Sequence, residues 1–193
     1  VILSATDSLN WLSKITGQKQ ADLAGAAEAH FTGPGEEIFL PYLSGERTPH
    51  NNANTRGSFV GLSQSTDSAQ MAQAVMEGVT FAMRDCQRVL ADAGTKIDRL
   101  LAVGGGSKSA LWLKMLATNL DMEIALPEDG DFGGALGAAR LGLCAATGAR
   151  PADVMSMPPI KTTIAPDTSL SSAYSDQYAR YRALYPAIEE ARS

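Results

Sequence analysis

The sequence has no run of clustered lysine and arginine residues. Of its 193 residues, 16 are basic and 21 are acidic, so the formal net charge is -5. Proteins that bind DNA or RNA need grouped cations to neutralise the phosphates. Aromatic residues make up only 6% of the chain, which argues against a platform on which bases stack. The composition therefore predicts no nucleic-acid partner.

Cysteine and histidine are scarce as well, with two residues of each type. Cys86 and Cys144 lie in apolar segments that are expected to be helical, and His30 and His50 are far apart in the sequence. No set of these residues has the spacing of a zinc site. We expect both cysteines to be small buried apolar residues, and no metal site is predicted.

Long apolar runs and targeting segments are also missing. No stretch approaches the ~20 apolar residues of a membrane-spanning helix, so no membrane partner is expected. The chain opens with Val1 and lacks both a leading methionine and the basic segment of a signal peptide. This start predicts a cut inside a longer polypeptide, with a reducing cytoplasm as the default location.

Three well-known motifs are absent. A P-loop fails because position 102 is alanine and Lys108 follows a serine instead of a glycine. A dinucleotide fingerprint that starts at Gly104 would need a glycine at position 109, which is Ser109. There is no G-x-S-x-G segment either, so a hydrolase has little support.

The sequence does contain a strand, a glycine turn and a helix in direct succession. Leu100–Val103 is typical of a buried strand, Gly104–Gly106 of a turn, and Ser109–Leu120 of a helix. Three glycines can bring bare main chain against a flat or anionic ligand, and the start of a helix offers free N–H groups. The pattern predicts a nucleotide site or, on spacing alone, close packing of the helix against the strand.

The segments after this turn continue the alternation of strands and helices. A strand over Met122–Leu126, an acidic loop at 128–131 and a helix over Phe132–Thr147 together indicate an α/β layer fold. Each glycine inside a helix costs about 1 kcal/mol relative to alanine. The four glycines of the 132–147 helix therefore predict a close crossing with another helix. We expect a surface connection over 151–167 and a closing helix over Ser169–Ile188. The tyrosines of this helix recur at helical spacing and are expected to pack rather than to take part in chemistry: Tyr174, Tyr178, Tyr181 and Tyr185.

The first half of the chain is expected to be mainly helical. The longest helix should run over 68–93, with Asp67 and Gln70 forming a capping box and Gly94 following its end. The polar segment around His50 and the following Arg56 could line a cleft, or could be a solvated loop with local ion pairs. The other expected elements are helices over 4–15 and 20–29, a strand over 38–40, an irregular segment over 41–54, and a strand or turn over 57–62.

Taken together, these segments resemble the FGGY family of carbohydrate kinases. The segments R-G-x-F-x-G-L at 56–62 and Q-M-x-x-A-V-M-E at 70–77 match its second signature. The segment P-Y-L-S-G-E-R-T-P at 41–49 is similar to the preceding loop in its xylulokinase members. G-G-G-x-x-S-x-x-W at 104–112 resembles the family's adenosine-binding turn, and 129–139 resembles its closing loop and helix.

This resemblance runs from about Leu3 to Tyr185 and implies two α/β domains of the actin, Hsp70 and hexokinase type, with ATP in the cleft between them. It implies transfer of the γ-phosphate of ATP to D-xylulose, with Mg²⁺ assisting. Residues 1–193 would form the C-terminal, ribonuclease H-like domain, with its start and the N-terminal domain absent. Another sugar or polyol (glycerol, gluconate or L-ribulose) and a non-catalytic ATP-binding module of the actin or Hsp70 kind are the alternatives.

The resemblance also implies nucleotide-binding positions in the glycine turn, at the start of the helix after it, and in the first helix: Gly105, Gly106, Ser107, Ala110, Asn10 and Thr6. The catalytic aspartate and most of the sugar site would lie upstream of Val1. We therefore expect the 193 residues alone to bind nucleotide weakly and to catalyse nothing. The sugar would be reached through the N-terminal domain, and a homodimer is one assembly that the resemblance allows.

Overall fold

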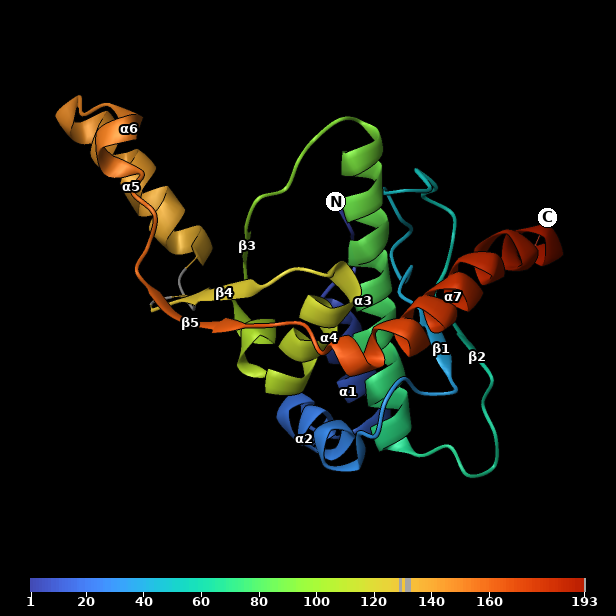
Figure 1. The fold of residues 1–193 in the computed structure, drawn as a ribbon. Helices are drawn as coiled ribbons and strands as arrows, with labels where there is room; N and C mark the ends of the chain where they lie inside the picture. Colours follow the sequence, from blue (N-terminus) through green and yellow to red (C-terminus); the bar gives the residue numbers. More distant parts are fainter. Residues whose placement is uncertain (129, 131–132, 193) are drawn as a thin grey trace.

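The computed structural model describes residues 1–128, 130 and 133–192 of the chain (Figure 1). In chain order, the helices and strands are α1 (Asp7–Thr16), α2 (Gln20–His30), β1 (Ile38–Leu40), β2 (Ser58–Val60), α3 (Ser68–Asp92), β3 (Leu100–Leu101), α4 (Ala110–Leu120), β4 (Ile124–Pro127), α5 (Gly133–Thr147), α6 (Pro151–Val154), β5 (Ile160–Ile164) and α7 (Ser171–Arg192). Short 3₁₀ turns lie at Gly105–Lys108 and Thr168–Leu170. The predicted acidic loop and the first residue of the predicted 132–147 helix fall largely outside the described residues.

Helix α3 is the central element of the fold (Figure 1). The Asp67 side chain accepts from the backbone N–H groups of Ala69 and Gln70, and the Gln70 side chain accepts from the Asp67 N–H, so the predicted capping box is confirmed. Strand β1 crosses α3 so closely that a Cβ atom at Gly78 would collide with the carbonyl oxygen of Phe39. A glycine is therefore required at this crossing.

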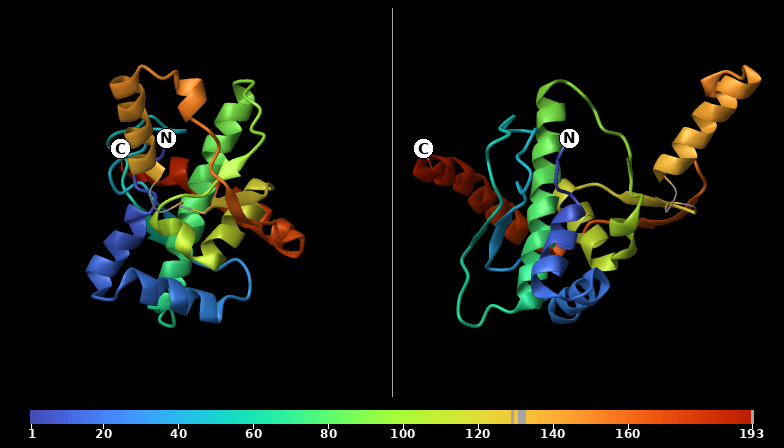
Figure 2. Two further views of the ribbon diagram at one scale, coloured as in Figure 1. Left: turned by 90° about the vertical axis from the view of Figure 1, so that its left-hand side faces the viewer. Right: turned by 180° about the vertical axis from the view of Figure 1, so that it is seen from behind.

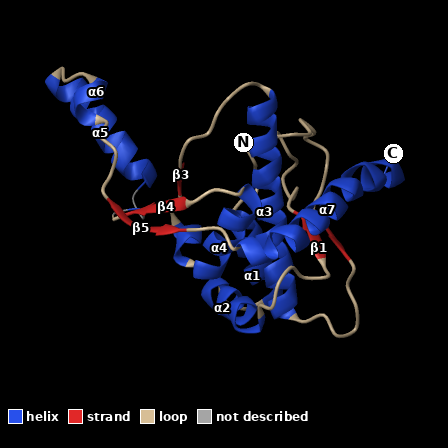
Figure 3. Cartoon of the chain, viewed as in Figure 1, coloured by secondary structure: helices blue, strands red, loops and turns tan. Residues whose placement is uncertain are grey.

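Two small sheets flank α3, one on each side (Figures 1 and 3). One consists of β1 and β2, which pair antiparallel. The other has the strand order β3-β4-β5, with β3 parallel to β4 and β5 antiparallel to it. The parallel pair joined through α4 confirms the predicted strand, turn, helix and strand succession of an α/β fold.

Helix α7 packs through its tyrosines, as their helical spacing predicts. Tyr174 and Tyr181 are buried against the α3 side of the core. Tyr178 donates a 2.5 Å hydrogen bond to the carboxylate of Asp85, a residue of α3 that is only 2% exposed. The helix runs to Arg192 with Pro186 inside it, which is a few residues beyond the predicted end.

Three expectations about the helices and strands are wrong. The 151–167 segment is not a plain surface connection, because it contains α6 and strand β5. The β-branched run Ile160–Ile164 pairs with β4, although the prolines on both sides of it suggested an irregular segment. The 100–103 run is not buried throughout, since Leu101 and Val103 are 39% and 52% exposed. Strand β3 lies at the edge of its sheet in the described chain.

The third wrong expectation concerns α5, for which the four glycines predicted a close helix crossing. No residue of this helix is buried, and α5 extends away from the rest of the described chain together with α6 (Figures 1 and 2). A Cβ atom at Gly134, Gly137 or Gly142 would meet nothing within 4 Å. Only Gly133 lies close to a neighbour, the side chain of Val103.

The cysteines are less buried than expected, because both Cys86 and Cys144 are partly exposed free thiols. Among the described residues, no helix is both long and apolar enough to cross a membrane.

Candidate nucleotide-binding site

The glycine turn is a tight, internally bonded segment between β3 and α4. Gly104 has φ +84° and ψ -171°, a conformation that only glycine adopts without strain. Its carbonyl oxygen accepts from the Ser107 hydroxyl at 2.6 Å. Its N–H donates to the carbonyl oxygen of Gly130 at 3.0 Å. The turn is therefore closed by a bond within it and fixed at its start to Gly130.

Helix α4 begins directly after this turn and fixes its position against α3. The Ser109 hydroxyl caps the helix by accepting from the Trp112 N–H at 3.2 Å. The indole N–H of the buried Trp112 donates to the carbonyl oxygen of Met76 in α3 at 2.9 Å. This bond connects the glycine turn to the segment that carries the kinase-like signature.

Helix α1 lies close to the same turn. A Cβ atom at Gly106 would sit 3.3 Å from the Thr6 hydroxyl oxygen and 3.7 Å from the Trp112 ring. At Gly105, by contrast, a Cβ atom would meet nothing within 4 Å. Bare main chain at Gly105 therefore faces open space, while Gly106 allows α1 to approach.

A cavity of about 450 Å³ opens between α1, α2 and the glycine turn. Its size lies within the range of small-molecule binding sites. The cavity is lined from α1 and its N-terminal flank by Thr6, Leu9 and Asn10, from α2 by Gln20, Ala21, Ala24, Gly25 and Glu28, and from the turn and α4 by Gly105, Gly106, Lys108, Ser109 and Trp112. The ribbon places these three segments next to one another (Figure 2).

The structure brings four of the six predicted nucleotide-binding residues to this cavity: Thr6, Asn10, Gly105 and Gly106. Ser107 lies in the turn, where its hydroxyl is bonded to Gly104. Ala110 lines a neighbouring hollow formed with Lys114, Phe31 and β5. Contact of any of the six with a nucleotide stays a prediction.

The sequence reasoning missed the contribution of α2. Five of its residues line the cavity, and the small ones, Ala21, Ala24 and Gly25, recur at helical spacing. A face of small residues leaves room for a flat ligand opposite the glycine turn. This spacing was visible in the sequence, but nothing in it indicated which element faced that side of α2.

Helix α3 also carries a buried carboxylate, outside the cavity. Glu77, the last residue of the kinase-like signature, is 1% exposed and has no cationic partner among the described residues. It accepts hydrogen bonds from the Gln73 and Gln177 amides, the Tyr174 hydroxyl and the Gly35 N–H. Burial raises the pKa of Glu77 from 4.5 to about 7, and these donors oppose the shift.

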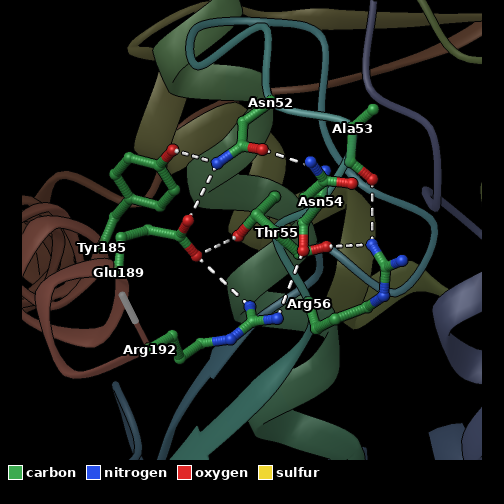
Figure 4. A network of polar contacts seen from close by, with 8 residues as sticks. All are labelled: Asn52, Ala53, Asn54, Thr55, Arg56, Tyr185, Glu189 and Arg192. Carbon is green, nitrogen blue, oxygen red and sulfur yellow. Dashed lines mark hydrogen bonds and ion pairs between the residues drawn. The ribbon is translucent and has the colours of Figure 1, made fainter.

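The loop over 41–55 packs against the C-terminal half of α7 (Figure 4). Asn52 donates to the carboxylate of Glu189 at 2.8 Å and to the Tyr185 hydroxyl at 3.2 Å. Arg192 bridges Glu189 and the carbonyl oxygen of Asn54. The His50 ring stacks on Tyr185 with centroids 3.4 Å apart. Of the two interpretations of this segment, the solvated loop does not hold for its middle, whereas Pro49 and His50 do line a hollow beside α7.

Directly after this loop, Arg56 donates to the carbonyl oxygens of Ala53 and Thr55 at 2.9 and 2.6 Å. Among the described residues, no carboxylate lies within ion-pair distance of Arg56. These residues also contain no group of three His, Cys, Asp or Glu side chains that could hold a metal ion.

Comparison with known proteins places this arrangement in a family. The family model for the C-terminal domain of the FGGY family of carbohydrate kinases matches residues 2–146. The chain belongs to the FGGY family. Its mixed α/β fold is the one that the FGGY sugar kinases share with actin and hexokinase, which confirms the predicted fold class.

Several FGGY relatives carry the name xylulose kinase. The chain is 37% identical to xylulose kinase of Escherichia coli (strain K12) over 97% of its own length and 39% of that protein. It is 42% identical to xylulose kinase of Klebsiella pneumoniae over 73% of its length and 29% of that protein. The crystal structure of a xyloylose kinase from Brucella ovis matches with 53% identity and a TM-score of 0.88 over 98% of this chain and 40% of that one. This FGGY chain thus spans well under half the length of these relatives.

Proposed function

We propose that this chain is the nucleotide-holding, C-terminal part of an ATP-dependent D-xylulose kinase, which forms D-xylulose 5-phosphate and ADP. The observation that carries the proposal is the cavity between the glycine turn, α1 and α2 in a chain that belongs to the FGGY family. The similarity to proteins named xylulose kinase over nearly the whole chain supports the sugar. Residues 1–193 would be an incomplete C-terminal domain.

The role of this chain would be to position the nucleotide. Phosphoryl transfer depends mainly on alignment and on electrostatic stabilisation of the transferred group. The glycine turn and α2 would hold the adenosine, so that the phosphates extend toward the N-terminal domain. The aspartate that accepts the proton of the attacking hydroxyl would lie in the part of the enzyme that precedes Val1.

Mg²⁺ would enter bound to the nucleotide phosphates. The described residues form no cluster of metal ligands, so we assign no residue of this chain to the ion. We further propose a cytoplasmic enzyme without nucleic-acid or membrane partners, in which a homodimer is one allowed assembly.

Gluconate is an alternative substrate that needs a direct test. Gluconokinase of Bacillus subtilis is 36% identical to this chain over 115 residues, and a gluconate kinase from Lactobacillus acidophilus matches with 27% identity and a TM-score of 0.77. The FGGY membership speaks against a non-catalytic module of the actin or Hsp70 kind.

The test is ADP release by the full-length enzyme with D-xylulose, gluconate, glycerol and L-ribulose. We expect the highest kcat/KM with D-xylulose. A higher value with another sugar would reassign the substrate, and nucleotide hydrolysis independent of any sugar would favour the binding module. We expect the isolated 193 residues to bind ADP weakly and to show no turnover, so ATP-dependent phosphorylation of D-xylulose by this chain alone would contradict its assignment as a part of the enzyme.

A further inference from the structure

Three side chains form a series of hydrogen bonds at one end of the nucleotide cavity. The Asn10 Nδ2 donates to the Asp7 carboxylate at 3.1 Å. The Gln20 Nε2 donates to the Asn10 Oδ1 at 3.2 Å. Asn10 and Gln20 both line the cavity, whereas Asp7 does not. The series therefore joins the first turn of α1 to the first residue of α2 at the rim of the cavity.

The Asp7 carboxylate sets the direction of every bond in this series. An ionised carboxylate can only accept hydrogen bonds, so the Asn10 amide must turn its NH₂ group toward Asp7. The Asn10 oxygen then faces α2, and Gln20 must present its own NH₂ group to that oxygen. If either amide were turned round, two donors or two acceptors would oppose each other.

Gln20 keeps hydrogen-bonding capacity after this bond is made. Its amide nitrogen carries two hydrogens, of which one is used by Asn10. Its Oε1 has no partner among the described residues. One donor and one adjacent acceptor on a planar amide are the complement of adenine, which presents its 6-amino hydrogens beside a ring-nitrogen acceptor.

We propose that Gln20 recognises the 6-amino group of adenine and thereby makes the enzyme selective for ATP over 6-oxopurine nucleotides. This proposal rests on the proposed function, since it concerns the same cavity. A purine with an oxygen at position 6 presents an acceptor to the Gln20 Oε1, which leaves both oxygens without a donor. Asp7 is a positioning residue, because it prevents the two amides from turning round to suit the wrong base.

Other groups around the cavity are less suited to this role. Gly105 and Gly106 offer only main chain, and the Ser109 hydroxyl already accepts from the Trp112 N–H. The cavity does contain a second acceptor on α2, the Glu28 carboxylate. It is eight residues after Gln20, which places it about 12 Å further along the helix axis. Glu28 is therefore at the other end of the cavity, too far to share one purine edge with Gln20.

The test compares ATP with inosine triphosphate as phosphate donors for the full-length enzyme, because the two differ at the 6-position and in the protonation of N1. We expect the wild type to prefer ATP by about tenfold or more in kcat/KM, the scale of one amide–adenine pair. Gln20→Ala should reduce this preference to about twofold by raising the KM for ATP, with the KM for the sugar unchanged. Asp7→Ala should reduce the preference partly, since the amides can then turn round.

Gln18→Ala is the matched control. Gln18 lies two residues earlier, bonds to the Ser68 hydroxyl and does not line the cavity, so this change should leave the preference as in the wild type. The proposal is overturned if folded Gln20→Ala keeps the full ATP preference, or if Glu28→Ala removes it while Gln20→Ala does not.

Failure of the proposed function would look different. If the wild type shows no turnover with ATP and D-xylulose, calorimetric binding of ADP and inosine diphosphate replaces the kinetic comparison. Tighter binding of ADP that is lost in Gln20→Ala would support the base contact without the kinase assignment. No binding of ADP to the wild type would overturn both.

Discussion

The indole Nε1 of Trp112 lies 2.9 Å from the carbonyl oxygen of Met76, in the interior of the protein. The same carbonyl oxygen also accepts from the Thr80 hydroxyl at 2.8 Å. This contact joins α4, which starts at the glycine turn, to α3, which carries the family signature. Two motifs that are about 30 residues apart in the sequence are thereby held together.

Loss of this contact should destabilise the domain by a measurable amount. Trp112→Phe keeps a large apolar ring but removes the donor, so the Met76 oxygen loses one partner. We expect a loss of about 1 kcal/mol beyond the effect of the smaller ring, measured by urea unfolding. Trp11→Phe is the control, because Trp11 stacks on Phe39 with centroids 5.8 Å apart and no described residue accepts a hydrogen bond from its indole. Equal losses in the two variants would contradict the structural role of the bond.

The open face of Gly105 predicts a change in binding without a change in stability. A Cβ atom there meets nothing within 4 Å, so Gly105→Ala should alter the free energy of unfolding by less than about 0.5 kcal/mol. If the main chain of the turn faces the nucleotide, the methyl group should weaken ADP binding by about tenfold, or about 1.4 kcal/mol. Calorimetry with ADP measures this effect.

Gly142→Ala serves as the matched change for this experiment. It also adds a methyl group in open space, but in α5, away from the cavity, and should leave ADP affinity unchanged. Undiminished ADP affinity of Gly105→Ala would show that the nucleotide does not approach the turn there.

The sequence predicted those features that depend on neighbours along the chain. The capping box of Asp67 and Gln70, the turn at Gly104 and the tyrosine face of α7 are local patterns, and the structure confirms them. Strand β5 was missed because the prolines on both sides of it suggested an irregular segment. Its partner strand, β4, lies more than 30 residues away in the sequence. The role proposed for Gln20 could not be predicted, because it depends on α2 lying opposite the glycine turn, which is a matter of tertiary packing.

The contact between the 41–55 loop and α7 predicts that a change in α7 will make the loop less ordered. Glu189 accepts from Asn52 and Thr55 at 2.8 and 2.9 Å, so Glu189→Ala would leave both donors without their acceptor. We expect faster hydrogen exchange over 41–55 and a loss of about 1–2 kcal/mol in stability. Asp176→Ala changes an exposed carboxylate elsewhere on α7 and should alter neither the hydrogen exchange of the loop nor the stability. Unchanged exchange in Glu189→Ala would mean that the loop is held by other contacts, such as His50 on Tyr185.

The buried carboxylate of Glu77 makes the stability of the domain depend on pH. Because its pKa is raised from 4.5 to about 7 in the folded protein, the folded state binds its proton more tightly than the unfolded state does. The contribution of Glu77 to stability is therefore complete below about pH 4.5 and decreases as the pH rises to about 7. The total loss is about 3 kcal/mol at most.

Glu77→Gln should remove this part of the pH dependence, since an amide does not titrate in this range. Urea unfolding at pH 5 and pH 8 gives the change in the free energy of unfolding between the two pH values, and this change is compared between wild type and variant. Glu36→Gln, a change at an exposed carboxylate in the neighbouring segment, is the control and should keep the pH dependence of the wild-type stability. The direction of the effect is decisive. If the four donors instead kept Glu77 ionised, the wild-type protein would become more stable relative to Glu77→Gln as the pH rises from 5 to 8. That result would show that hydrogen bonding outweighs burial at this position.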